Sequence, residues 1–173
     1  RAAPPPAPLF EARRDGQDIV TSGQPEASLG YRFTRSEGEP DGGNWAGWSW
    51  DGSRLTAEND QLGAYPLYYA ASEDRVVISS SIDSLLAAGV PTELDVDGLA
   101  VFLTVGYSVG QDTPFAAIRT LPPAGKLTWG PGGLIVASQP RRFATVSMTR
   151  EQAIEEAIER TRTAVARCLP DDD

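Results

Sequence analysis

"NDQLGAYPLYYA", residues 59–70, combines an Asp-x-x-Gly turn with a short strand that begins at a proline. Gly63 permits a tight turn, and Pro66 stands where a strand can start, since proline donates no ladder hydrogen bond. Tyr68 or Tyr69 then presents an aromatic face to a core. The stretch therefore predicts an architectural turn between two strands.

The sequence around this turn predicts an antiparallel meander of four strands over residues 45–80. Asp51-Gly52 is a strong hairpin signal between the first two strands. The expected strands are WAGWSW (45–50), RLTAEN (54–59), PLYYAAS (66–72) and DRVVISS (74–80). Upstream, GQDIVTSG (16–23) and LGYRFTRS (29–36) read as short strands on either side of a Gly/Pro turn.

Downstream, the pattern predicts helices and one further hairpin. A short helix follows Ser81 as a candidate N-cap, and a second follows Asp95 with Leu99, Phe102 and Leu103 on one face. KLTWG and LIVAS form a hairpin around PGG. The last and strongest helix is TREQAIEEAIERTRTAVARCL (149–169), which opens with a Thr-x-x-Gln capping box. Strands followed by helices indicate an α+β domain with antiparallel sheets.

Composition excludes several classes of function. The chain has 173 residues, a formal net charge of −9, no histidine and one cysteine, Cys168. An acidic chain without a basic stripe repels phosphate backbones and anionic membranes, so neither nucleic-acid nor membrane binding is expected. Without histidine, Ser-His-Asp, Cys-His and histidine-metal sites are excluded.

Two further features concern location. No apolar run reaches the about 18 residues of a transmembrane span. The proline-rich residues 1–16 read as an extended lead-in and lack the apolar core of a signal peptide. We therefore expect a cytoplasmic protein.

The chain from about Trp45 to Leu169 resembles asparagine synthetase-like proteins in successive pieces. RLTAENDQLGAYPLYYA is similar to that family's strand–turn–strand, and VVISSSIDSLLAAG to its strand leading into a helix. LDVDGLAVFLTVGYSVGQDTPFAAIRTLPPAGKLTW is similar to the end of its glutaminase domain, and the terminal helix to the start of its synthetase domain.

The resemblance implies a class II glutamine amidotransferase domain. That fold is N-terminal-nucleophile hydrolase-like, here shortened, with antiparallel sheets, helices packed on the outside and a long C-terminal helix. Residues 17–146 would be a degenerate glutaminase-like domain, and residues 147–173 a helix that begins a synthetase domain. The family-signature positions, for which structural roles are expected, are Asp60, Gly63, Pro66, Leu67, Tyr68, Ser80, Gly106, Thr113, Pro122 and Gly125.

Departures from the family pattern point to a lost active site. The family's glutaminase uses an N-terminal cysteine whose own α-amino group serves as base, whereas position 1 here is Arg1. The family's Asn-Gly-Glu-Ile-Tyr-Asn segment is absent. Asn59 and Gln61 replace the arginines beside Asp60, Ser81 replaces a glutamate, and an alanine is inserted before Gly125. We therefore assign no catalytic and no metal-binding residue.

These observations predict a non-catalytic glutaminase-like domain with a scaffolding or interaction role. It is either the front of a longer ATP-dependent amide-forming enzyme or a free-standing relic. No cofactor is expected in this chain, and ATP and magnesium would belong only to a longer parent, because a pyrophosphate-binding Ser-Gly-Gly-x-Asp-Ser loop is absent. The expected partner is a synthetase domain, or a second copy through the apolar face of the C-terminal helix.

Two alternatives stay open. A shortened but active amidohydrolase would use a non-cysteine nucleophile, Thr21 or Ser22. An independent binding module would hold a ligand with Trp45, Trp48 and Trp50, although their spacing favours a single core-facing side of one strand. Cys168 is expected to pack as a small buried thiol, and the terminal aspartates to be solvated.

Overall fold

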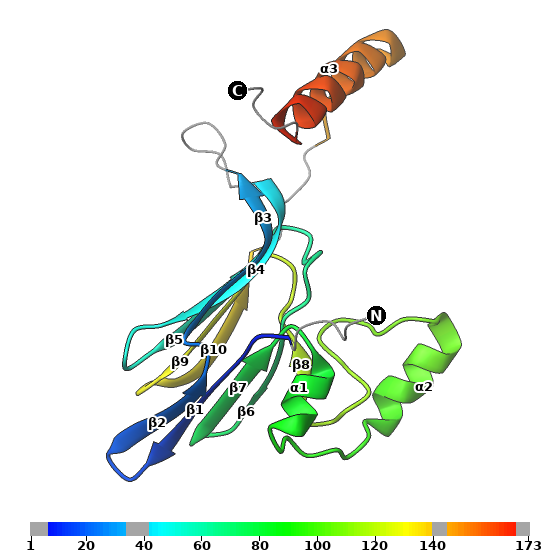
Figure 1. Cartoon of the computed structure of the whole chain (residues 1–173). Helices are drawn as coiled ribbons and strands as arrows, with labels where there is room; N and C mark the ends of the chain where they lie inside the picture. Colours follow the sequence, from blue (N-terminus) through cyan, green and yellow to red (C-terminus); the bar gives the residue numbers. More distant parts are fainter. Residues whose placement is uncertain (1–6, 34–41, 140–144, 169–173) are drawn as a thin grey trace, which may run out of the picture. The chain divides into compact units, whose positions relative to one another are not determined.

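The structure is a computed structural model that describes residues 7–33, 42–139 and 145–168. The chain forms two compact units, residues 1–141 and 142–173. The first unit contains two antiparallel five-stranded sheets and two helices, and the second contains one long helix (Figure 1). This confirms the predicted α+β class with antiparallel sheets and a C-terminal helix.

The first sheet, sheet A, has the strand order β2-β1-β7-β6-β8. Its strands are β1 (Leu9–Asp15), β2 (Asp18–Gly23), β6 (Tyr68–Ala71), β7 (Arg75–Ser79) and β8 (Arg119–Thr120). The second sheet, sheet B, has the order β10-β9-β5-β4-β3. Its strands are β3 (Glu26–Phe33), β4 (Gly42–Trp50), β5 (Leu55–Asn59), β9 (Gly125–Gly130) and β10 (Gly133–Ser138).

The main core lies between the two sheets. Alternate residues of the central strands project into it, which is the period-two pattern of a half-buried strand. Sheet A contributes Phe10, Ala12, Tyr69, Val76 and Ile78, and sheet B contributes Ala46, Trp48, Leu55, Ala57, Leu127 and Trp129. A second, smaller cluster around Leu85 covers the other side of sheet A.

The expected lead-in over residues 1–16 is wrong for residues 9–15. These residues form β1, which pairs with β2 on one side and with β7 on the other. Phe10 and Ala12 are almost fully buried, at 1% and 0% exposure. The prolines before this strand favoured an extended chain, but the alternation of Leu9–Asp15 makes that extended segment a central strand.

The predicted four-stranded meander is corrected to two hairpins in different sheets. β4 pairs with β5 in sheet B, and β6 pairs with β7 in sheet A. The turn after Asn59 carries the chain from one sheet to the other, and β9 takes the place beside β5 where β6 was expected. Local sequence signals specify hairpins but do not specify which sheet a strand joins.

The three tryptophans of β4 do not share a face, contrary to the prediction. Trp48 is buried in the main core and Trp50 packs against it. Trp45 projects to the opposite, outer face of sheet B, because residues 45 and 48 differ by an odd number along the strand.

The two helices of the first unit lie on the same side of sheet A (Figure 1). Helix α1 (Ile82–Ala87) places Leu85 against Val77 of the sheet. Ser81 occupies the N-cap position, but its side chain makes no capping hydrogen bond; its N–H instead donates to Ser79 Oγ over 3.1 Å. Helix α2 (Val96–Val105) contains no buried residue; of the expected apolar face, Leu99 is half-buried, whereas Phe102 and Leu103 are 41% and 81% exposed.

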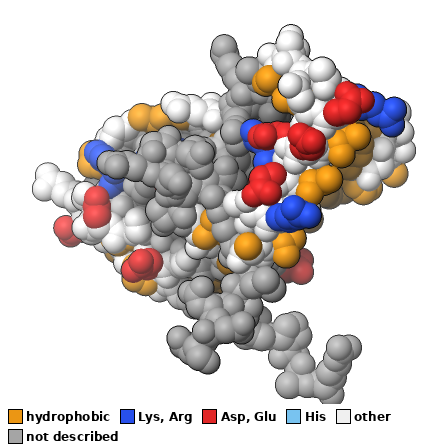
Figure 2. Space-filling model, turned by 90° about the horizontal axis from the view of Figure 1, so that it is seen from above, with side chains coloured by type: hydrophobic (Ala, Val, Ile, Leu, Met, Phe, Trp, Pro, Cys, Tyr) orange, Lys and Arg blue, Asp and Glu red, His pale blue; other side chains and the backbone are white. Residues whose placement is uncertain are grey.

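The second unit consists of helix α3 (Arg150–Cys168) and the residues around it. The predicted capping box is confirmed: Thr149 N donates to Gln152 Oε1 over 2.9 Å, and Gln152 N donates to Thr149 Oγ1 over 3.2 Å. Figure 2 shows apolar side chains of this helix beside its charged ones, and Ile154, Ile158 and Val165 are about half exposed. The side chain of Cys168 and the terminal aspartates lie outside the described residues.

Candidate functional site

Asp60, the acidic residue of the signature turn, is 3% exposed and is held by backbone groups. Its carboxylate accepts hydrogen bonds from the N–H of Leu62 (2.8 Å), Ala64 (3.2 Å) and Trp45 (3.2 Å). Its own carbonyl accepts from Gly63 N and Ala124 N, at 3.0 and 2.9 Å. The side chain therefore fastens the turn to β4, and a buried carboxylate of this kind is satisfied by its N–H partners.

Asn59 fastens a second loop to the same place. Its Nδ2 donates to Leu121 O over 3.2 Å, and its Oδ1 accepts from Gly125 N over 2.7 Å. The amide thus spans both ends of the Leu-Pro-Pro-Ala-Gly loop that precedes β9. Asn59, the replacement expected to mark a decayed polar site, is in this chain a buried residue whose two polar side-chain atoms are both hydrogen-bonded.

Steric constraints explain the glycines of these two loops. A Cβ on Gly125 would lie 2.4 Å from the carbonyl oxygen of Pro122, and a Cβ on Gly63 would lie 3.2 Å from Pro123 Cα. Gly63 also has a φ of 61°, in the left-handed region. Ala124 takes the same region with a φ of 49°, which costs an alanine about 1–2 kcal/mol. Asp60, Gly63, Pro122 and Gly125 are therefore brought together in two adjoining loops, called the latch below, in which Asp60 and Gly125 are buried.

The signature strand β6 places its aromatic residues on both faces of sheet A. Tyr69 lies in the main core, and its hydroxyl donates to Gln111 Oε1 over 3.2 Å. Burial raises the pKa of Tyr69 above its ordinary 10.0, while the charge of Arg119 acts in the opposite direction. Tyr68 packs with the smaller cluster, and Leu67, which follows Pro66, is fully buried.

Ser80 is half-buried directly after the end of β7. Its neighbour Ser79 is the fully buried hydroxyl: Ser79 Oγ donates to Pro8 O over 2.8 Å and accepts from Ser81 N. This contact ties the start of β1 to the end of β7.

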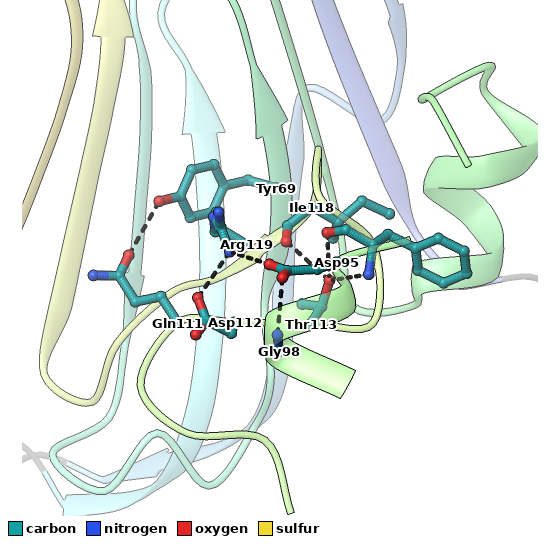
Figure 3. A network of polar contacts seen from close by, with 9 residues as sticks. Tyr69, Asp95, Gly98, Gln111, Asp112, Thr113, Ile118 and Arg119 are labelled. Carbon is teal, nitrogen blue, oxygen red and sulfur yellow. Dashed lines mark hydrogen bonds and ion pairs between the residues drawn. The ribbon is translucent and has the colours of Figure 1, made fainter. Parts of the chain in front are cut away.

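The remaining signature positions, Thr113 and Gly106, flank the base and the end of α2. Thr113 is 3% exposed, with Oγ1 at 2.9 Å from Ile118 O (Figure 3). Asp95 accepts from Gly98 N over 2.9 Å, which confirms the predicted cap, and lies 3.5 Å from Arg119. Gly106 ends the helix in the left-handed conformation with a φ of 84°. The Asp95 contacts anchor the first turn of α2, and the Thr113 hydrogen bonds close the loop that precedes β8.

A cavity of about 560 Å³ lies beside the latch, on the outer face of sheet B. β5 and β9 place Glu58 opposite Lys126 in this face, and their charged groups are 2.6 Å apart. The guanidinium of Arg32 lies 4.1 Å from the ring centroid of Trp45. The cavity is lined by Arg32, Trp45, Glu58, Asn59, Gln61, Ala124, Gly125, Lys126, Ala137 and Gln139.

The chemistry of this lining suits polar, non-covalent contacts. It combines an ion pair, an aromatic surface and side-chain amides, and among the described residues it includes no serine, threonine or cysteine. A covalent amide hydrolase needs such a nucleophile beside a base. Within the part of the chain that the structure describes, no group of three or more acidic or cysteine side chains is placed to hold a metal ion.

Thr21 and Ser22 are not brought to this cavity. They lie on β2, the edge strand of sheet A, in register with Ala12 and Glu11, and both are exposed. Arg1 lies outside the described residues.

Sequence reasoning missed the role of Asn59 and the outer-face position of Trp45. Alternation along β5 was a usable signal, because it places residue 59 on the same inward face as Leu55 and Ala57. A buried amide at a strand end requires partners on both its atoms. The cross-strand pair Glu58–Lys126 required knowledge of the β5–β9 pairing, which joins strands far apart in sequence.

The described helices include none that is both long and apolar enough to cross a membrane. Comparison with curated proteins gives no match. The family model of the glutamine amidotransferase domain matches residues 42–157, a span that runs from β4 through the latch and into α3 and covers more than half of the chain. The chain therefore belongs to the glutamine amidotransferase domain family.

Proposed function

We propose that this chain is a non-catalytic glutaminase-like domain of an asparagine synthetase-related protein, with a scaffolding or interaction role and a shortened N-terminal-nucleophile hydrolase-like architecture. The observation that carries the proposal is the lining of the cavity beside the latch, in which the described residues include no serine, threonine or cysteine. Histidine is absent from the sequence, so a Ser-His or Cys-His pair cannot form.

The use made of the signature residues supports the same conclusion. Asp60 and Asn59 spend their polar atoms on backbone groups of the latch. Polar atoms that already bond to the backbone have less capacity left for a substrate. The signature positions thus hold together the loops that connect sheets A and B, and we propose that these two sheets serve as the scaffold.

The asparagine synthetase relationship rests on the order of the similar segments between Trp45 and Leu169. In a longer parent, an ATP- and magnesium-dependent domain would carry the amide-forming step, and α3 would present Ile154, Ile158 and Val165 to it or to a second copy. Half-exposed apolar side chains along one helix face favour such a contact. We place the protein in the cytoplasm on the same resemblance.

The test is an assay for ammonia and glutamate release from glutamine by the full chain. An active class II amidotransferase in the same buffer provides the positive control. We expect no release above the buffer blank. Release that disappears in Thr21→Ala or Ser22→Ala would overturn the proposal in favour of an amidohydrolase with a hydroxyl nucleophile.

The parent relationship needs a separate measurement, the intact mass of the natural gene product in its own cells. A mass several-fold above 18.5 kDa supports a longer amide-forming parent. A mass near 18.5 kDa contradicts the longer parent and leaves a free-standing domain.

A further inference from the structure

Aspartate is followed by glycine at four places in the chain, residues 15–16, 41–42, 51–52 and 97–98. The main-chain nitrogen after an aspartate can attack the side-chain carboxyl carbon, and glycine hinders that attack least because it has no side chain. The structure describes the pairs at Asp15, Asp51 and Asp97, whereas residue 41 lies outside the described residues. These three pairs share one chemistry but differ in their surroundings, so the fold decides which of them reacts.

Asp51 is protected by its own turn. Its Oδ1 accepts from Ser53 N and Arg54 N, both over 2.8 Å, and from Ser53 Oγ over 3.0 Å. The hydrogen bond from Ser53 N, followed by those from Arg54 N and Ser53 Oγ, lowers the pKa of Asp51 and keeps its carboxyl group ionised. An ionised carboxylate has no hydroxyl to lose and resists attack by a nitrogen. The turn therefore protects the Asp51–Gly52 pair.

Asp97 is protected in a different way, because it lies in the first turn of α2. Gly98 N, the nitrogen that would attack, donates to Asp95 Oδ1 over 2.9 Å. The space beside Gly98 is also filled, since a Cβ there would lie 3.1 Å from Asp95 Cγ. Attack on Asp97 would therefore require loss of the helix cap.

Asp15 has neither kind of protection. It ends β1 at the turn that leads into β2, and both Asp15 and Gly16 are exposed. Among the described residues, neither the Asp15 carboxylate nor Gly16 N takes part in a hydrogen bond or ion pair. A Cβ on Gly16 would meet no atom within 4 Å. A ring between Asp15 and Gly16 therefore has room to form.

The strand opposite Asp15 also favours the reaction. Asp18 faces Asp15 in the β1–β2 register, and like charges directly opposite each other destabilise a strand pair. Ring formation removes the charge of Asp15 and with it this repulsion. Because β2 is the edge strand of sheet A, a change at this turn leaves the pairing of β1 with β7 intact (Figure 1).

We propose that Asp15 is a modification site, at which the folded chain isomerises to isoaspartate through a succinimide. Gly16 N forms a bond to Asp15 Cγ, the bond from Cγ to its hydroxyl breaks, and the hydroxyl leaves with the Gly16 N–H proton as water. Water then adds to the main-chain carbonyl carbon of Asp15 and breaks its bond to Gly16 N. The chain now continues through the side chain of Asp15 and leaves a free α-carboxyl group. The water lost in the first step is regained in the second, and the inference is independent of the proposed function.

Peptide mapping of the folded full chain during storage at neutral pH tests the proposal. An isoaspartyl peptide has the mass of its parent but elutes separately, and a protein-isoaspartate methyltransferase labels its free α-carboxyl group. We expect isoaspartate to accumulate at Asp15 at least several-fold faster than at Asp51 or Asp97. The matched variant is Asp15→Glu, which keeps the charge but would have to form a larger ring, so the signal at this position should be lost. Circular dichroism checks that the stored protein and the variant are folded.

Storage of the same chain in urea separates the effect of the fold from that of the sequence. Unfolding releases the Asp51 turn and the Asp95 cap, so Asp51 and Asp97 should then isomerise at rates comparable to that of Asp15. The proposal is overturned if the folded chain forms no isoaspartate at Asp15, or forms it as fast at Asp51 or Asp97. Slow reaction of Asp51 and Asp97 in urea would also overturn it, because their protection would then lie in the local sequence.

Discussion

Replacing Asp60 by alanine should lower the stability of the first unit severely. The substitution leaves the N–H groups of Leu62, Ala64 and Trp45 without their carboxylate acceptor. A hydrogen bond to a charged group contributes about 1.5–3 kcal/mol when its partner is left buried. Leu62 is 73% exposed, so water can replace its bond in part. We therefore expect a loss of about 3–4 kcal/mol, a large fraction of the about 5–15 kcal/mol that stabilises a domain.

Asp51 provides the matched control because it makes the same kind of turn in water. Its carboxylate accepts from Ser53 N and Arg54 N, both at 2.8 Å, and these backbone hydrogen bonds lower the pKa of Asp51. The group is fully exposed, so in Asp51→Ala the freed N–H groups bind water. Burial, rather than the number of hydrogen bonds, should separate the two variants.

Urea unfolding followed by tryptophan fluorescence measures the difference, since Trp48 and Trp129 are buried in the main core. With a slope of about 2 kcal/mol per molar urea, Asp60→Ala should move the midpoint down by about 1.5–2 M. Asp51→Ala should move it by a small fraction of that. Equal midpoints for the two variants would refute the reasoning that the buried latch depends on the Asp60 carboxylate.

Three further outcomes follow from the same contacts. Ala124→Gly should raise the urea midpoint by up to about 0.5 M, because it removes the strain of an alanine in the left-handed region, which costs about 1 kcal/mol. Gly125→Ala should lower the urea midpoint, because the added Cβ would lie 2.4 Å from Pro122 O. A lower urea midpoint for Ala124→Gly than for Gly125→Ala would contradict the described conformation of this turn. Because burial raises the pKa of Tyr69 in the folded protein, the contribution of its neutral hydroxyl to stability is fully present below pH 10.0. That contribution is lost as the pH rises through the pKa of Tyr69 in the folded state. Tyr69→Phe should therefore flatten the decline of stability above pH 10.0, and an unchanged decline would count against burial as its cause. Asp95→Ala should lower the helical circular dichroism signal and cost about 1 kcal/mol of stability, and an unchanged spectrum would show that the cap does not hold α2.

Local signals predicted the elements whose causes are local. The Asp51-Gly52 hairpin joins β4 to β5, the Asp95 cap starts α2, and the Thr149–Gln152 box starts α3. Each of these features depends on residues within about four positions of one another, so a single stretch of sequence contains the whole interaction. The Asp60 turn belongs to this group only in part: its carboxylate accepts from Leu62 N and Ala64 N within the turn, whereas its third bond, from Trp45 N, reaches back to β4.

Pairing across the chain was not predicted, because it depends on partners that are distant in sequence. Leu9–Asp15 was assigned to a lead-in although it lies between β2 and β7, and the link to β7 joins Phe10 to Ile78. The expected meander failed for the same reason, since β5 pairs with β9 and not with β6. Strand register and neighbours are fixed by which faces can be buried together, and that is a property of the folded sheets.

The sequence by itself determined the α+β class, the positions of the main turns and helix caps, and the absence of histidine chemistry. Composition can be counted directly, and turns and caps depend on hydrogen bonds between residues that are close in the sequence. Only the tertiary structure decided that Asn59 closes a latch with Leu121 and Gly125, more than 60 residues away. Only the tertiary structure, too, placed Trp45 on the outer face of sheet B and left α2 without a buried residue. The physical reason is burial: whether a polar or apolar side chain is satisfied depends on which distant segment packs against it.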